Sequence, residues 1–187
     1  MYQEGLSGEI GMLAVFCDFD GTITKEDVVD KLLFKFSSNH ALSQKYEEKW
    51  RRGEISSKEC LINQVRTIEV TERQVQDFLD EIEVESGFVS FDKFLEKEEI
   101  HFIILSDGFD LFIKEILKKH KIGHYAVHSN RITNNDKIWQ LHFPHEGSAC
   151  KKCAHCKRET ISRYGSLNKK TVYIGDGLSD THAVEFV

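Results

Sequence analysis

The sequence predicts an α/β fold with a Rossmann-like, mostly parallel sheet that carries helices on both faces. Short apolar runs alternate with segments whose apolar residues recur at helical spacing, which is typical of parallel strands joined by helices. Three of these runs are followed by a turn rich in Asp, Gly or Ser. With 187 residues, the chain is long enough for one such domain with an inserted segment.

The first predicted strand is the apolar run 13–17, which is followed by Asp18-Phe19-Asp20-Gly21-Thr22. Side chains alternate along an extended segment, so Asp18 and Asp20 are expected on one face. Two carboxylates at a strand end, followed by a Gly that allows a sharp turn, could hold a divalent cation or attack a phosphorus atom. A solvated Asp-Gly turn explains these five residues equally well. Residues 1–11 show little periodicity and are interpreted as a tag or an extended start.

Residues 25–87 are predicted to form an inserted all-helical unit of about four helices. Apolar residues recur there at helical spacing, and no proline interrupts them. Ser56 and Thr71 stand where helices would begin, each followed three residues later by Glu or Gln. The aromatic residues of this segment are expected to belong to its core rather than to a binding surface: Phe34, Phe36, Tyr46 and Trp50.

The α/β core is assigned to residues 12–24 and 88–187. A helix near 88–97 is followed by the run 100–105, whose continuous apolar character is typical of a strand covered on both faces. Ser106-Asp107-Gly108 is predicted to form a turn. Further elements are expected along the rest of the chain: a strand at 125–128, a hairpin arm at 137–142, a helix near 158–164 and a strand at 171–174.

Polar side chains follow three of the predicted parallel strands. Asp18 and Asp20 follow the first, Ser106 the second, and Asp176 with Asp180 the last. Ligands bind at the carboxyl ends of strands in open α/β sheets, so we expect these side chains to form one site. Four carboxylates at one edge would repel one another unless a cation lay among them. Ligands that are all oxygen atoms suit Mg²⁺.

The order of these motifs resembles that of the haloacid dehalogenase-like hydrolases. The first Asp motif, Ser106, a lysine before a helix and the Gly175–Asp180 turn match that family over nearly the whole chain from Met12. The insert between the first two motifs resembles the branch that contains phosphoserine phosphatase. This resemblance implies a phosphoric monoester hydrolase with a haloacid dehalogenase-like core and a helical cap over its active site.

The resemblance also implies catalytic and metal-binding residues. Asp18 would be the nucleophile that forms an aspartyl-phosphate, and Asp20 would act first as general acid and then as base. Lys157 would neutralise the phosphoryl group; it is chosen over Lys151 and Lys152 because it opens the helix before the last strand. The implied Mg²⁺ site consists of Asp18, the backbone carbonyl of Asp20 and Asp176, with Asp180 supporting it from one turn into the following helix.

Substrate and phosphate contacts are implied for a second group of residues: Thr22, Asp27, Ser106, Asp107 and Gly108. The hydroxyls of Thr22 and Ser106 would hold phosphoryl oxygens, as hydrogen-bond donors do in such sites. The structural alternatives are a helix-entry residue for Thr22 and an ordinary turn at Ser106.

The cysteine-rich run Cys150-x-x-Cys153-x-x-Cys156, which ends in Cys-Lys, resembles the phosphatases of methionine salvage. Those enzymes act on 2-hydroxy-3-keto-5-methylthiopentenyl-1-phosphate. Phosphoserine phosphatases carry Glu where Asp27 stands, which makes phosphoserine the second choice of substrate. The three thiols, with His145 and His155 nearby, could also bind Zn²⁺, although their tight spacing fits a reduced loop better.

A different class of function stays open beside the enzyme, namely a zinc-binding interaction module on the Cys/His loop with a decayed catalytic core. The intact residues Asp18, Asp20, Asp176 and Lys157 count against it. A metal assay showing stoichiometric zinc without phosphatase activity would favour this module.

Composition limits the partners and the compartment. A net charge of −6 argues against nucleic-acid binding, and no apolar run is long enough to cross a bilayer. Five cysteines, an odd number, fit a reducing cytosol, so we expect a cytoplasmic protein whose partner is a small phosphorylated metabolite. The sequence stops at Val187, where the resemblance implies further elements. We therefore expect a truncated form that either self-associates through an uncovered sheet edge to give a homo-oligomer or is markedly less stable than a longer form.

Overall fold

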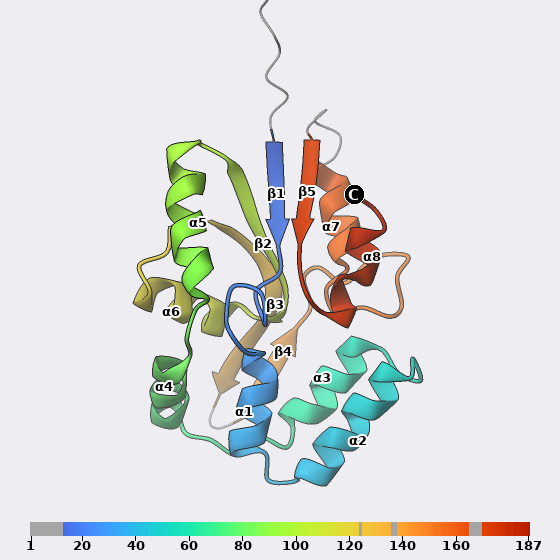
Figure 1. Ribbon diagram of the computed structural model, residues 1–187. Coiled ribbons are helices and arrows are strands. Elements are labelled where there is room, and N and C mark those ends of the chain that lie inside the picture. Colours follow the sequence, from blue (N-terminus) through green and yellow to red (C-terminus); the bar gives the residue numbers. More distant parts are fainter. Residues whose placement is uncertain (1–12, 124, 136–137, 165–169) are drawn as a thin grey trace, which may run out of the picture.

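A five-stranded sheet forms the centre of the structure, a computed structural model that describes residues 13–123, 125–135, 138–164 and 170–187 (Figure 1). The interpretation of residues 1–11 as a tag or extended start therefore lies outside the described residues. The strands are β1 (Leu13–Cys17), β2 (His101–Phe109), β3 (Ala126–Asn135), β4 (Ile138–His142) and β5 (Lys170–Ile174).

The strand order is β4-β3-β2-β1-β5, and the predicted parallel arrangement is confirmed. β1 pairs in parallel with both β2 and β5, β2 pairs in parallel with β3, and β4 is antiparallel to β3. The chain builds β2 and β3 on one side of β1 and β5 on its other side. The strand order therefore changes direction at β1, and the carboxyl end of β1 opens onto the crevice where α/β sheets bind ligands.

Helices cover both faces of the sheet, as predicted (Figure 1). Val15 of β1 joins the core that includes Phe88 of α5 (Ser86–Lys97) and Phe112 of α6 (Asp110–Lys119). The next residue, Phe16, joins the opposite core with Ile161 of α7 (Lys157–Tyr164); α8 (Thr181–Val184) lies on the same face. Because alternate strand residues reach opposite layers, β1 reads as a continuous apolar run.

The turn predicted at Ser106-Asp107-Gly108 is wrong, because β2 continues through these residues to Phe109. The strand keeps its pairing with β3 by an irregularity: Ser106 lies opposite Ser129, and Phe109 lies opposite Asn130. The Ser106 hydroxyl accepts a hydrogen bond from the Gly108 N–H at 2.8 Å, which stabilises the bulged backbone locally. The bulge redirects these side chains at the edge where the predicted site lies.

Four inserted helices lie beyond the carboxyl end of β1 (Figure 1): α1 (Val28–Phe36), α2 (His40–Arg51), α3 (Ser57–Val65) and α4 (Glu72–Glu81). The two predicted helix starts are confirmed. The Ser56 hydroxyl accepts from the Glu59 N–H at 3.0 Å, and Thr71 forms a capping box with Gln74. These caps satisfy N–H groups that have no partner within the helix.

The chain enters and leaves the inserted helices at adjacent backbone positions. Thr24 and Val84 form an isolated antiparallel bridge. The Lys25 N–H donates to the Glu83 carbonyl at 3.1 Å, and the Glu85 N–H donates to the Ile23 carbonyl at 2.9 Å. This two-stranded junction is one attachment of the inserted helices to the core. The predicted domain boundaries around residues 24 and 87 stay a prediction.

Four aromatic residues of the insert were expected in its core, but among them Phe36 alone joins a core cluster of the described residues, and Tyr46 is half-buried outside both clusters. Phe34 is 83% exposed, because α1 buries Val28, Val29, Leu32 and Leu33 and turns position 34 away from that face. Trp50 is partly buried and lines a cavity instead. Phe36, by contrast, packs edge-on against the buried Phe78, with ring centroids 6.0 Å apart.

Within the described residues, β5 pairs with β1 alone, so β5 is the edge strand on that side of the sheet. The self-association expected along this edge stays a prediction. The search of the same residues finds no helix that is both long and apolar enough to cross a membrane.

Candidate active site

Asp18 lies at the point where β1 and β5 end together. Its N–H donates to the carbonyl of Ile174, the last residue of β5, at 2.8 Å, so sheet pairing fixes its backbone. Its Oδ1 accepts a hydrogen bond from the Phe19 N–H at 2.8 Å. The side chain is buried but lines the mouth of a cavity, which leaves the carboxylate in reach of a ligand.

Lys157, the first residue of α7, is a buried cation between two carboxylates. Its Nζ lies 2.8 Å from Asp18 Oδ1 and 2.6 Å from Asp180 Oδ1. Burial acts against the ammonium, but the negative charges around it, Asp18 first, raise the pKa of Lys157 well above its usual range. Lys151 and Lys152 are exposed, so Lys157 is the lysine that the fold brings to the predicted site.

The two carboxylates beside Lys157 titrate differently. Burial raises the pKa of Asp18 to about 7, against the opposing effect of the Lys157 ammonium. Burial also acts on Asp180, but the charge of Lys157 and hydrogen bonds from Lys157, Tyr173 and the Gly177 N–H hold its pKa below the usual value. A divalent cation beside Asp18 would favour its ionised form, because the charge of a bound ion adds to that of Lys157.

Asp20 lies apart from Lys157 and favours the protonated state. Burial, together with the charges of Asp27 and Asp18, raises the pKa of Asp20 well above its usual range. Its Oδ2 accepts from the Ser106 hydroxyl at 2.9 Å, and its Oδ1 accepts from the Val28 N–H at 3.1 Å. A Cβ on Gly108 would come within 2.6 Å of Asp20 Oδ2, so a glycine there allows this carboxyl its position.

The hydroxyls of Thr22 and Ser106 both donate to carboxylates in this structure. Thr22 Oγ1 lies 2.7 Å from Asp176 Oδ1, and the Ser106 hydroxyl donates to Asp20 Oδ2. Gly21 has φ of +74°, and a Cβ on it would meet Asp176 Oδ2 at 2.8 Å. Only a glycine fits such a close left-handed turn without strain. The phosphate contacts expected of Thr22 and Ser106 stay a prediction.

A metal ion would find three of the four predicted ligands together. Carboxylate oxygens of Asp18, Asp176 and Asp180 all lie within 4.8 Å of one another, and Asp176 is exposed. Asp20 was predicted to bind through its backbone carbonyl, and that contact stays a prediction. Its carboxylate accepts hydrogen bonds from Ser106 and from the Val28 N–H. A set of carboxylate oxygens that is open to water on one side fits Mg²⁺, which keeps several waters when bound.

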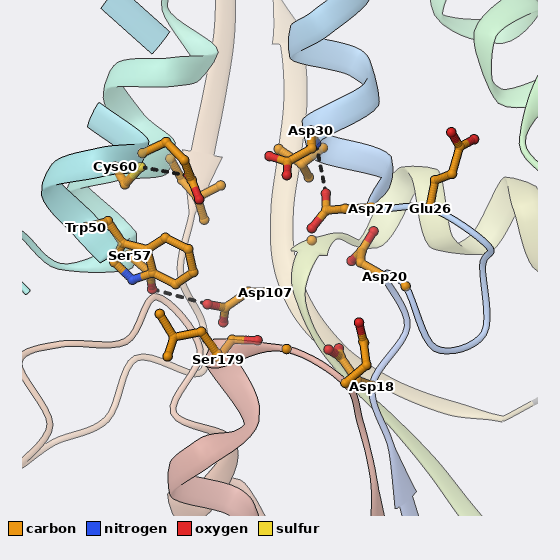
Figure 2. Close-up of a pocket in the computed structure, with 18 of the residues that line it drawn as sticks. Asp18, Asp20, Glu26, Asp27, Asp30, Trp50, Ser57, Cys60, Asp107 and Ser179 are labelled. Carbon is orange, nitrogen blue, oxygen red and sulfur yellow. Dashed lines mark hydrogen bonds between the residues drawn. The ribbon is translucent and has the colours of Figure 1, made fainter. Parts of the chain in front are cut away.

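A cavity of about 510 Å³ separates these carboxylates from the inserted helices (Figure 2). Its wall on the insert side includes Asp27, Asp30, Trp50, Ser57 and Cys60. Asp27 caps α1, accepting from the Asp30 N–H at 2.8 Å, and so faces the cavity from a fixed backbone. The sequence interpretation missed Trp50 and Ser57. A lone Trp in the otherwise polar stretch 47–54 was a usable signal for Trp50.

Asp107 lines the cavity, is partly buried, and has partners for both its carboxylate oxygens. Oδ1 accepts from the His155 N–H at 3.0 Å, and Oδ2 accepts from the Ser57 hydroxyl at 3.2 Å. Asp107 therefore joins β2 to the loop before α7 and to α3. The substrate contact expected of Asp107 stays a prediction.

No zinc site is formed by the described cysteine and histidine side chains. All five cysteines are free, and Cys150 and Cys153 approach each other with their Sγ atoms at 3.4 Å. No group of three thiols or imidazoles comes as close together as the Asp group does. The ring of His155 is occupied elsewhere: Nδ1 lies 3.1 Å from the Ser106 carbonyl and Nε2 lies 2.9 Å from Thr160 Oγ1.

Comparison with known proteins agrees with this arrangement. The family described as "Putative Phosphatase" matches residues 12–187. A curated "2-hydroxy-3-keto-5-methylthiopentenyl-1-phosphate phosphatase" of Bacillus mycoides (strain KBAB4) is 28% identical over 177 residues, covering 92% of this chain and 80% of that protein.

Solved structures share the fold. A substrate-bound phosphoserine phosphatase complex matches with a TM-score of 0.74 and 19% identity, covering 96% of this chain and 84% of that one. A phospho-aspartyl intermediate analogue of phosphoserine phosphatase gives a TM-score of 0.73 and 17% identity, covering 95% and 84%. At these identities the likeness shows a common fold.

Replacement of Lys157 should destabilise the protein strongly. Lys157→Met leaves the buried carboxylates of Asp18 and Asp180 without their cation, which should cost about 3 kcal/mol of unfolding free energy. The control Lys151→Met removes an exposed lysine six residues away and should change stability by less than about 0.5 kcal/mol. Urea unfolding at pH 7 measures both, and equal midpoints would contradict the role of the ammonium.

Proposed function

The chain belongs to the "Putative Phosphatase" family of haloacid dehalogenase-like phosphatases, and on that basis we propose a Mg²⁺-dependent hydrolysis of a small phosphomonoester through an aspartyl-phosphate. The observation that carries this proposal is the pair of differently placed carboxyl groups beside one cavity. Asp18 contacts the Lys157 ammonium, whereas Asp20 is partly buried, lacks that cation and favours the protonated form. One group is thus prepared to attack and the other to donate a proton.

In the first half-reaction, a carboxylate oxygen of Asp18 forms a bond to phosphorus while the bond from phosphorus to the leaving oxygen breaks. Asp20 gives its proton to that leaving oxygen, so the product departs as a neutral alcohol. Lys157 stabilises negative charge beside Asp18 without rearrangement, because Asp18 and Asp180 already hold its ammonium in place.

In the second half-reaction, Asp20 is a carboxylate and takes a proton from a water molecule. The water oxygen bonds to phosphorus and the bond between phosphorus and Asp18 breaks, which releases inorganic phosphate and restores both carboxyl groups. Asp18, Asp176 and Asp180 are the residues that would hold Mg²⁺. When bound, the ion would offset the negative charge of the phosphoryl group.

The substrate that we favour is 2-hydroxy-3-keto-5-methylthiopentenyl-1-phosphate. Proteins named for its hydrolysis match 92% of the chain at 26–28% identity. Phosphoserine is the alternative, supported by structural neighbours whose likeness shows the fold alone. The zinc-binding module has no support among the described cysteines and histidines. The five free thiols suit a reducing compartment, so we place the enzyme in the cytoplasm.

Loss of the nucleophile should abolish turnover. Asp18→Asn should lower the rate of p-nitrophenyl phosphate hydrolysis at least about 10³-fold, because an amide cannot form the acyl phosphate. Asp77→Asn, an exposed change on α4, is the control and should keep the wild-type rate. Steady-state assays with Mg²⁺ measure the rates of both variants and of the wild type. Substantial activity in Asp18→Asn would rule out the covalent route.

Metal removal should silence the enzyme reversibly. EDTA should stop hydrolysis and added Mg²⁺ should restore it, because the ligand set consists of oxygen atoms. Asp176→Asn should raise the Mg²⁺ concentration for half-maximal rate about tenfold or more, since one of three carboxylates is lost. Titration of the rate with Mg²⁺ measures this. Restoration by Zn²⁺ and not by Mg²⁺ would show that the site is assigned to the wrong ion.

A comparison of substrates tests the second half of the proposal. The specificity constant kcat/KM should be at least about tenfold higher for 2-hydroxy-3-keto-5-methylthiopentenyl-1-phosphate than for phosphoserine. Release of inorganic phosphate, followed with both compounds under one set of conditions, gives this ratio. A preference for phosphoserine would replace the favoured substrate by the alternative while leaving the phosphatase chemistry intact.

A further inference from the structure

Besides the junction of Thr24 and Val84 and the packing of α4 on α6, the inserted helices touch the core on the far side of the cavity. Figure 2 shows Ser57 of α3 next to Asp107, on the opposite side of the cavity from Glu26 and Asp27. Ser57 is 7% exposed, although it belongs to the insert and lies at the start of a helix. Its burial results from contacts with two core segments.

Ser57 uses its full hydrogen-bonding capacity in these contacts. Its N–H, which has no partner within α3, donates to the Lys152 carbonyl at 2.9 Å. Its hydroxyl accepts from the Ala154 N–H at 2.7 Å and donates to Asp107 Oδ2 at 3.2 Å. A serine hydroxyl has one hydrogen to donate and lone pairs to accept, so both directions are satisfied.

Beyond Ser57, the contacts lead directly to the catalytic groups. Asp107 follows Ser106, whose hydroxyl donates to Asp20. Asp107 Oδ1 accepts a hydrogen bond from the N–H of His155, which lies two residues before Lys157. Lys58 adds a peripheral contact, with Nζ 2.6 Å from Glu146. The start of α3 is thereby tied to β2, whose Ser106 contacts Asp20, and to the loop that leads into Lys157.

We propose that Ser57 is a positioning residue that holds the insert wall of the cavity against the core through Asp107 and the loop 152–154. The two-stranded junction and the packing of α4 on α6 hold one side of the insert, and Ser57 holds the other. This inference rests on the proposed phosphatase function only where it concerns substrate: the wall that Ser57 holds, with Trp50 and Cys60, faces the leaving group.

The neighbouring Ser56 provides a matched control. Its hydroxyl accepts from the Glu59 N–H inside α3, so Ser56→Ala removes a helix cap, whereas Ser57→Ala removes the contact between insert and core. Both changes delete one hydroxyl from adjacent positions. A general loss of helix stability would therefore appear in both variants, and a loss of positioning only in Ser57→Ala.

Amide hydrogen exchange, followed by NMR, tests the attachment without any assay of activity. In Ser57→Ala, the N–H groups of residue 57 and His155 should exchange about tenfold faster, although their acceptors, the Lys152 carbonyl and Asp107 Oδ1, remain. In Ser56→Ala, the Glu59 N–H should exchange faster while these two keep wild-type rates. Wild-type rates at residues 57 and 155 in Ser57→Ala, or equal acceleration in both variants, would overturn the proposal.

Kinetics with a phosphomonoester test the consequence for substrate. Ser57→Ala should raise KM about tenfold and change kcat less than about twofold, because Asp18, Asp20 and Lys157 keep their contacts. Ser56→Ala should leave KM unchanged. A lower apparent kcat at constant KM would indicate lost folded enzyme and overturn the positioning role. An inactive wild type would remove the proposed function, while the exchange data would still decide the attachment.

Discussion

The ammonium of Lys157, held between Asp18 and Asp180, is the interaction on which the rest of the structure depends. Parallel pairing of β1 with β5 brings the two acidic strand ends together, so the sheet itself creates a concentration of negative charge. A buried carboxylate without a partner is costly, and two are worse. Lys157, at the first position of α7, supplies the cation that these buried carboxylates need. The site is therefore complete only when α7 is packed against the sheet.

The same cation explains why two carboxyl groups two residues apart behave differently. Asp18 contacts Lys157, whereas Asp20 is directed toward Ser106 and the start of α1 and is partly buried without a compensating cation. In the proposed reaction, environment rather than residue type therefore distinguishes the nucleophile from the proton donor. The close approach of Gly108 to Asp20 is part of this arrangement, since a side chain there would displace the carboxyl.

Local rules predicted much of this from sequence. Alternating apolar runs gave the sheet, the caps at Ser56 and Thr71 gave helix starts, and the strand-edge rule grouped Asp18 with Asp176. What could not be predicted depends on contacts between distant segments. The hydrogen bond from Ser57 to Asp107 joins residues 50 positions apart, and the exposure of Phe34 depends on which face of α1 meets the core. Local periodicity carries no information about the first, whereas the helical spacing of Val28, Leu32 and Leu33 already leaves Phe34 outside the buried face of α1.

The bridge between Thr24 and Val84 has a consequence for how such proteins diversify. Because the inserted helices begin and end at neighbouring backbone positions, they form a cassette that can be exchanged, lengthened or recombined without altering the register of β1 with β2. Natural selection can then act on the choice of metabolite in one stretch of the gene and on phosphoryl chemistry in another. An exchanged insert would have to form again the contacts that Ser57 makes with Asp107 and Ala154 of the core.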